Sequence, residues 1–288
     1  MKKIILSLSV VAAVAVVVVG ATTAFFSDTE TSTGNTFTAG AIDLKIDFDG
    51  YFNKRADRVP NAGSWDEQDL VAGMKFFNFT DLKPGDFGEG TISLHVYDND
   101  AWGRMLIEGV VDSGNTCVDP ETEASADADC IGRPVGTPEA DGELRENLKF
   151  SACLDWGGTP GFQNILANGT SNTAFHDQEE GDNICQTNEP MVITEGTIDQ
   201  NGETHEFWPA LAALWIQNCT DFNVAGANNY GECQGIAQDG RLVGSTTYYL
   251  AVNWNLPYAT GNEAQSDTLQ STIKFQAVQH RNNPSQTF

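Results

Sequence analysis

The stretch AIDLKIDF, residues 41–48, decides the class of fold. Polar and apolar side chains alternate along it without interruption, a period of two that is typical of a half-buried β-strand. One face of this strand would point into a core, and the other would face solvent. The core-facing residues are Ile42, Leu44, Ile46 and Phe48.

Further strands are predicted at intervals along the chain, separated by Gly, Asn, Asp and Pro. Many short strands with such turns indicate an all-β protein, specifically a jelly-roll-like β-sandwich. Inward faces are expected at Ile92, Leu94 and Val96, at Tyr248, Leu250, Val252 and Trp254, and at Ile273, Phe275 and Ala277. The stretches are TISLHVYD (91–98), RMLIEGVV (104–111), KFSACLDW (149–156), MVITEGTI (191–198), TYYLAVNW (247–254) and TIKFQAV (272–278).

Helix signals occur in two short stretches. DGELRENLKF (141–150) predicts a helix capped by Asp141, because Asp is a favoured N-cap residue. EFWPALAALW (206–215) predicts another, with Pro209 in its first turn. One or two short helices are therefore expected beside the strands.

The N-terminus resembles an export signal. A basic start, Met1-Lys2-Lys3, precedes an apolar run that ends in small residues up to Ala24. This pattern predicts a cleavable signal peptide over 1–24 and a secreted protein at the cell surface or outside the cell. An uncleaved membrane anchor is the alternative, because the apolar run is just long enough to span a bilayer. After the predicted signal peptide, residues 25–40 are expected to form an N-terminal segment, and residues 41–288 a single domain.

Six cysteines lie beyond the leader, and none forms a C-x-x-C pair. An even number of cysteines in an exported chain predicts three disulfides. Pairing between neighbours along the chain is expected, which would pin long loops at about 112–142, 157–190 and 216–240. The expected pairs are Cys117–Cys130, Cys153–Cys185 and Cys219–Cys233.

The chain is strongly acidic. It has 15 Lys and Arg against 40 Asp and Glu, which gives a net charge of −25. Such a chain repels phosphate, so nucleic acid is excluded as a partner. No resident cofactor is expected, although an acidic surface suits bound divalent cations. Since cations screen like charges, packing of such chains side by side should increase with salt or calcium.

No assembled active site is found. The metalloprotease motif H-E-x-x-H begins at His205-Glu206 but fails, because Pro209 stands where the second His is required. His95 falls at an outward strand position and is interpreted as solvated. Asp98-Asn99-Asp100 has calcium-like spacing, but it is interpreted as a turn after a strand. No catalytic residue and no metal ligand is therefore predicted.

Three N-x-S/T sequons begin at Asn78, Asn168 and Asn218. They matter only in an organism that attaches N-glycans. Asn168 lies in the most loop-like setting and is the best candidate of the three.

Two separated parts of the chain carry a family resemblance. The first comprises AFFSDTETSTGNTFTAGAIDLKI (24–46) and FTDLKPGDFGEGTISLHVYDND (79–100), and the second is NWNLPYATGNEAQSDTLQSTIKFQAVQHRN (253–282). Together they resemble the TasA/camelysin family of exported proteins. The middle of the chain, with the cysteines, has no clear counterpart. The residues taken as family marks are Leu82, Lys83, Pro84, Gly85, Asp86, Trp254, Pro257, Gln265, Phe275 and Gln279.

The resemblance implies a jelly-roll subunit of an extracellular filament, either a biofilm matrix fibre or a bundling pilus. A dedicated (SipW-type) signal peptidase would remove the leader, and the N-terminal segment would complete a sheet of the next subunit. The partners would be other copies of the chain and matrix or cell-surface components. The segment is rich in β-branched Thr and lacks Pro, which suits a strand. Its expected pairing residues are Phe25, Phe26, Thr29, Thr31, Thr33 and Phe37.

Two alternatives remain open at this stage. One is a monomeric secreted β-sandwich of the cell envelope that binds carbohydrate. The other is a camelysin-like metalloprotease, which the failed histidine motif makes a weaker hypothesis.

Overall fold

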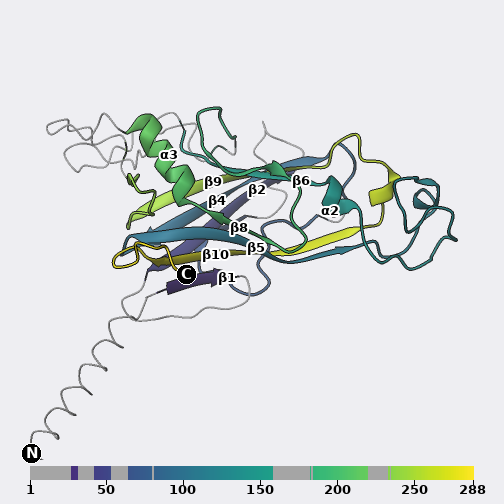
Figure 1. Ribbon diagram of the computed structural model, residues 1–288, viewed down its shortest axis with the longest axis horizontal. Coiled ribbons are helices and arrows are strands. Elements are labelled where there is room, and N and C mark those ends of the chain that lie inside the picture. The colour runs from purple at the N-terminus through teal and green to yellow at the C-terminus, as the bar shows by residue number, and fades with distance from the viewer. Residues whose placement is uncertain are drawn as a thin grey trace, which may run out of the picture.

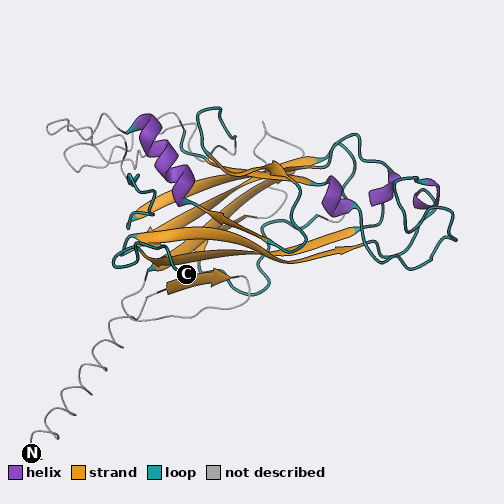
Figure 2. Ribbon diagram, viewed as in Figure 1, coloured by secondary structure: helices purple, strands orange, loops and turns teal. Residues whose placement is uncertain are grey.

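The computed structural model of the chain describes residues 27–31, 42–52, 64–79, 81–157, 182, 184–219, 233 and 235–288. Its strands form two antiparallel sheets that enclose a common core (Figures 1 and 2). Among the described residues, two α-helices lie outside the strands (Figure 2). The predicted all-β, jelly-roll-like sandwich with two short helices and disulfide-pinned loops is confirmed.

The smaller sheet of the described residues has four strands in the order β1-β10-β5-β8. These strands are β1 (Ser27–Thr31), β10 (Thr268–Gln279), β5 (Ala101–Ser113) and β8 (Glu203–Glu206). The larger sheet has six strands in the order β3-β2-β4-β9-β6-β7. These strands are β3 (Ser64–Gln68), β2 (Asp43–Phe52), β4 (Phe87–Tyr97), β9 (Thr246–Asn255), β6 (Lys149–Leu154) and β7 (Met191–Gly196).

The predicted inward faces are buried. Along β2, each apolar residue of the opening stretch is almost fully buried, and the polar residues between them are partly exposed. The inward residues of β4 and β9 lie in the same core. On β10, Phe275 and Ala277 are buried, whereas Ile273 is only partly buried at the margin. Alternation therefore identified the central strands correctly.

Two strands were missed, and both are polar. β3 has the sequence SWDEQ and β8 the sequence ETHE. Each lies at the edge of its sheet among the described strands, where a strand needs only one hydrogen-bonded neighbour. β3 is mostly exposed, and β8 is mostly half-buried. Charged side chains on an edge strand also prevent unwanted pairing. A hydrophobic pattern is therefore absent where these strands form.

The helices agree with the prediction except at one cap. Helix α3 spans Trp208–Asn218 and has Pro209 in its first turn, as expected. Helix α2 spans Leu144–Asn147, and Asp141 does not cap it. Instead, Oδ2 of Asp267 accepts the backbone N–H groups of Glu143 and Leu144, at 2.6 and 3.0 Å. The predicted cap was wrong because a carboxylate far away in sequence reaches the helix start.

The six cysteines form the sequential pairs expected from the sequence: Cys117–Cys130, Cys153–Cys185 and Cys219–Cys233. Each closes a loop, which in the chain-entropy account contributes about 3 kcal/mol to stability. The loops begin later than predicted, because β5 extends to Ser113 and α3 to Asn218. The division into leader, N-terminal segment and single domain stays a prediction.

The family-mark segment Leu82–Asp86 forms a tight turn. The N–H of Asp86 donates to the carbonyl of Lys83 at 2.8 Å, and Gly85 has φ +94°. Pro at the second position and a positive-φ Gly at the third are what a type II turn requires. Two further hydrogen bonds join this turn to Leu256, from Gly85 N to Leu256 O at 2.7 Å and from Leu256 N to Asp86 O at 2.8 Å. Two separated segments of the resemblance are thus neighbours in space.

Replacing Gly85 with alanine should destabilise the protein. The positive φ is unfavourable for any residue with a Cβ, and such strain costs about 1–3 kcal/mol. A Cβ here would also lie 2.2 Å from the Tyr258 ring. Gly73 is a matched control, since its φ of +96° is nearly the same but no atom lies within 4 Å of a Cβ there.

Urea unfolding should therefore show a larger loss for Gly85→Ala than for Gly73→Ala. Because Tyr258 is 88% exposed, its ring can move, and Tyr258→Ala should recover the difference between the two variants. Equal losses for both glycine variants would show that the turn does not depend on its close approach to Tyr258.

Candidate functional site

The edge where β1 meets β10 is the candidate assembly site. β1 is the outermost strand of the smaller sheet, and β10 lies between β1 and β5 (Figure 1). The two strands are antiparallel, with Ser27 opposite Val278 and Thr31 opposite Lys274. The first described strand of the chain is therefore paired with the last.

The β10 strand belongs to the core. Phe275 and Ala277 are 0% exposed. The Phe275 ring lies 5.9 Å from the Phe76 ring and 6.4 Å from the Phe207 ring, centroid to centroid. A core strand with one backbone edge left unpaired exposes a row of N–H and C=O groups. β1 covers this edge of β10 from Lys274 to Val278.

The predicted donor residues fall partly on this edge. Thr29 and Thr31 lie in β1, opposite Gln276 and Lys274. The other four predicted pairing residues lie outside the described residues: Phe25, Phe26, Thr33 and Phe37. In this structure the segment pairs with its own chain, whereas the resemblance implied pairing with the next subunit.

The position of β1 makes it separable from the rest of the sheet. It is hydrogen-bonded to β10 alone among the described strands, whereas β10 is also paired with β5 from Ala101 to Ser113. Removing β1 would leave the order of every other strand unchanged. It would expose the edge of β10 that β1 covers.

The residues taken as family marks lie near two contacts: the pairing of β1 with β10, and the hydrogen bonds between the Leu82–Asp86 turn and Leu256. Phe275 and Gln279 lie on β10, and Trp254 is a buried residue at the end of β9. The Trp254 ring lies 4.6 Å from the Phe79 ring. Pro257 follows the Leu256 contact with the turn, and Gln265 directly follows the 3₁₀ helix η3 (Asn262–Ala264). These residues therefore contribute to the packing and pairing of the two sheets.

The described histidines are separate, and each contacts a carboxylate. His95 Nε2 lies 2.6 Å from Asp47 Oδ2, and His205 Nε2 lies 2.7 Å from Glu203 Oε2. His280 Nε2 lies 3.0 Å from Asp239 Oδ2. The solvated state expected for His95 was wrong, because cross-strand neighbours hold its ring. His176 lies outside the described residues.

Candidate metal ligands among the described residues are carboxylates and one cysteine. That cysteine, Cys130, is disulfide-bonded and offers no thiolate. The calcium-like Asp98-Asn99-Asp100 segment forms the turn between β4 and β5, as predicted. Asp100 accepts hydrogen bonds from Arg241 Nε at 2.7 Å and from Gly244 N at 3.0 Å.

The sequons occupy different settings. Asn78 is exposed, and its Oδ1 accepts a hydrogen bond from Lys75 Nζ at 3.1 Å. Asn218 is the last residue of α3, beside the disulfide-bonded Cys219. Asn168 lies outside the described residues.

Residues 1–57 match the model of a family described as camelysin metallo-endopeptidase. The resemblance to the TasA/camelysin family is confirmed. The match spans the predicted leader (1–24), β1 and β2, and it ends before the histidines begin. No curated protein matches the chain.

None of the helices in the described residues is long and apolar enough to cross a membrane.

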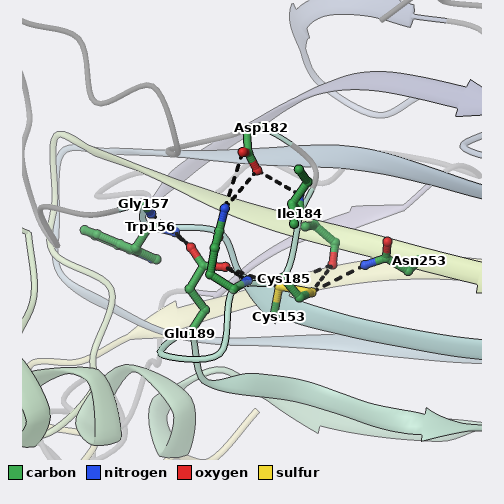
Figure 3. Close-up of a disulfide and its surroundings, with 10 residues drawn as sticks. Cys153, Trp156, Gly157, Asp182, Ile184, Cys185, Glu189 and Asn253 are labelled. Atoms are coloured by element: carbon green, nitrogen blue, oxygen red, sulfur yellow. Dashed lines mark hydrogen bonds between the residues drawn. A yellow bond between two sulfur atoms is a disulfide. The ribbon is translucent and has the colours of Figure 1, made fainter. Parts of the chain in front are cut away.

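A buried carboxylate fastens one of the cysteine loops (Figure 3). Glu189 Oε1 accepts the N–H groups of Trp156 and Gly157, at 2.8 and 2.9 Å. Its Oε2 accepts the N–H of Gln186 at 2.9 Å. The disulfide Cys153–Cys185 lies alongside and joins the loop to β6. Two of the hydrogen bonds of Glu189 tie the loop to the residues that follow β6, and the third closes a turn within the loop.

The substitution Glu189→Gln should lower the free energy of unfolding by about 1–3 kcal/mol, the cost of leaving a buried polar group without its partner. A glutamine keeps one acceptor oxygen, but its NH₂ group would face an N–H donor. Glu195→Gln is the matched control, because Glu195 is an exposed residue of β7. Urea unfolding would measure the free energy of unfolding of both variants. Equal values for Glu189→Gln and Glu195→Gln would contradict the role assigned to Glu189.

Proposed function

We propose that the chain is a structural subunit of an extracellular filament, a biofilm matrix fibre or bundling pilus, built by exchange of β1. The β1 strand of one subunit would pair with β10 of the next, in the place that its own β1 occupies here. The observation that carries this proposal is the position of β1, an edge strand that is hydrogen-bonded to the core strand β10 alone among the described strands.

Exchange of this kind conserves the hydrogen bonds. The same five residues of β1 would meet the same five of β10, so pairing within a chain and between chains differ little in backbone energy. The balance then depends on subunit concentration and on freeing of the N-terminal end. A dedicated signal peptidase that cuts after Ala24 would free that end.

The surface chemistry suits an exported matrix component. Three disulfides pin the loops, and such bonds persist in oxidising environments outside the cell. The net charge of −25 keeps single subunits soluble and disfavours nucleic acid. Partners would be other copies of the chain together with matrix or cell-surface components, with divalent cations between acidic surfaces.

A second candidate is a monomeric secreted envelope or carbohydrate-binding protein. The observation that favours it is that β1 already completes the sheet of its own chain. A monomer and a filament subunit thus differ in one respect, namely which copy of β10 receives β1.

A mixing experiment decides between them. One variant carries Thr29→Cys and another carries Gln276→Cys, because these two positions are opposite each other in the β1–β10 register. After the two purified variants are mixed and mildly oxidised, exchange predicts a covalent dimer on a non-reducing gel. The double variant should give a ladder of covalent oligomers.

The control pairs Thr29→Cys with Glu195→Cys, a position on the exposed face of β7 in the other sheet. It should give no dimer above background. Cross-linking within single chains only, at every concentration, would establish the monomer and overturn the proposed exchange.

The proposal includes that the chain is not a peptidase. Its described histidines each contact a carboxylate, and they lie on separate strands or loops. Clean recombinant protein supplied with zinc should leave casein intact. Casein cleavage that a chelator abolishes, and that His205→Asn also abolishes, would instead support the metallo-endopeptidase activity named for the family.

A further inference from the structure

A cluster of carboxylates lies at one end of the sandwich, away from the β1–β10 edge. It combines the loop between β5 and β6 with the loop between β9 and β10, beside α2 (Figure 1). The two loops are far apart in sequence. Their meeting at this end is a product of the fold.

The carboxylates form two groups that share one residue. Oxygens of Glu121, Asp127 and Glu139 lie within 4.8 Å of one another, and so do oxygens of Glu139, Glu143 and Asp267. Glu139 therefore links five carboxylates into one cluster. The Cys130 sulfur adjoins the first group but is bonded to Cys117.

Several oxygens of this cluster are buried without a hydrogen-bond partner. They are Asp127 Oδ2, both carboxylate oxygens of Glu139, Glu143 Oε2 and Asp267 Oδ1. Asp127 is 0% exposed as a whole residue. Burying an anionic oxygen without a hydrogen-bond donor costs free energy. Several such oxygens at one place therefore favour a bound ligand that would pair with them.

The opposite oxygens of the same carboxylates hold the surrounding backbone. Asp127 Oδ1 accepts the N–H of Asp129 and of Cys130, at 3.0 and 2.7 Å. Glu121 Oε2 accepts the N–H of Val118 at 2.7 Å, and Asp267 Oδ2 caps α2. Asp127 and Asp267 are thus fixed through one oxygen, and the other oxygen of each is buried in the cluster without a partner. The second oxygen of Glu121, Oε1, accepts a hydrogen bond from Ser266 Oγ at 3.3 Å.

No described ion pair offsets the negative charge of these five residues. The arginine near α2, Arg145, pairs instead with Asp112 and Glu146, at 3.5 and 3.3 Å. Burial, followed by repulsion from neighbouring carboxylates, raises the pKa of Glu139 to about 7, of Glu143 to about 8 and of Asp267 to about 7.

We propose that Glu121, Asp127, Glu139, Glu143 and Asp267 form a calcium-binding centre. The available ligands are hard carboxylate oxygens, with no histidine or free thiolate among them. Zinc prefers nitrogen and sulfur ligands. Magnesium requires near-ideal octahedral geometry and keeps its water, whereas calcium accepts six to eight oxygens in flexible arrangements.

Calcium bound here would join the two loops. Four of the ligands belong to the β5–β6 loop and its continuation into α2, and Asp267 belongs to the β9–β10 loop. The ion would fasten the end of the sandwich that carries Cys117–Cys130, in addition to the disulfide. Calcium would thus stabilise the folded subunit itself.

The test uses the full disulfide-bonded chain, stripped of metal with a chelator and then dialysed. Calorimetric titration with calcium chloride should show saturable binding, and the melting temperature should rise with calcium until it saturates. Magnesium and sodium chloride at equal ionic strength should raise it much less. No saturable calcium binding to the unaltered chain, or an equal effect of magnesium, would overturn the proposal whether or not any variant folds.

Two variants locate the centre, Asp127→Asn and Glu139→Gln. Without calcium, Glu139→Gln should melt at or above the temperature of the unaltered chain, because it removes repulsion. Both variants should bind calcium more weakly by about tenfold or more and lose the calcium-dependent rise in melting temperature. Glu195→Gln, an exposed carboxylate elsewhere, should keep that rise. The same rise in all three variants would mean that calcium acts on the general acidic surface and would overturn this assignment.

Discussion

The pairing of both edges of β10 is the constraint on which the smaller sheet depends. Phe275 and Ala277 place this strand in the core. β5 pairs with one edge of β10 along nearly its whole length, and the short β1 pairs with the other edge from Lys274 to Val278. Because β1 is held by one neighbour among the described strands, the proposed exchange would place a copy of β1 from another molecule on the same edge. Under that proposal, one set of hydrogen bonds would serve both the fold of the subunit and its assembly.

The larger sheet supplies the rigid part of this arrangement. Its central strands β2, β4 and β9 alternate regularly and bury their apolar faces against the smaller sheet. The turn at Leu82–Asp86 leads into β4 and is hydrogen-bonded to Leu256 at the end of β9. The segments that carry the TasA/camelysin resemblance therefore pair with one another: the turn pairs with the end of β9, and β1 pairs with β10.

The cysteine-bearing loops carry carboxylates that the packing of the two sheets does not require. Glu189 uses both carboxylate oxygens to hold backbone N–H groups, and it is a complete structural device. The carboxylates of the cluster beside α2 differ, because Asp127 and Asp267 bond the backbone through one oxygen and leave the other buried without a donor. Glu189 therefore holds a loop in place, whereas the carboxylates of the cluster have oxygens that the proposed calcium ion would bind. It also assigns part of the large negative charge to a defined place in the fold.

The sequence by itself determined the sandwich, its central strands, helix α3 and the cysteine pairing, because periodicity, Pro placement and short loop closure are local properties. It also indicated that residues near Thr29 and Thr31 form a strand, but not which copy of the protein receives it. Only the tertiary structure identified β10 as the partner of β1, since pairing depends on where the last strand lies. It likewise placed Asp267 at the start of α2, formed the polar edge strands β3 and β8, and selected five carboxylates out of forty acidic residues. The physical reason is the same in each case: these contacts join residues far apart in the chain, and no local pattern encodes the distance between them.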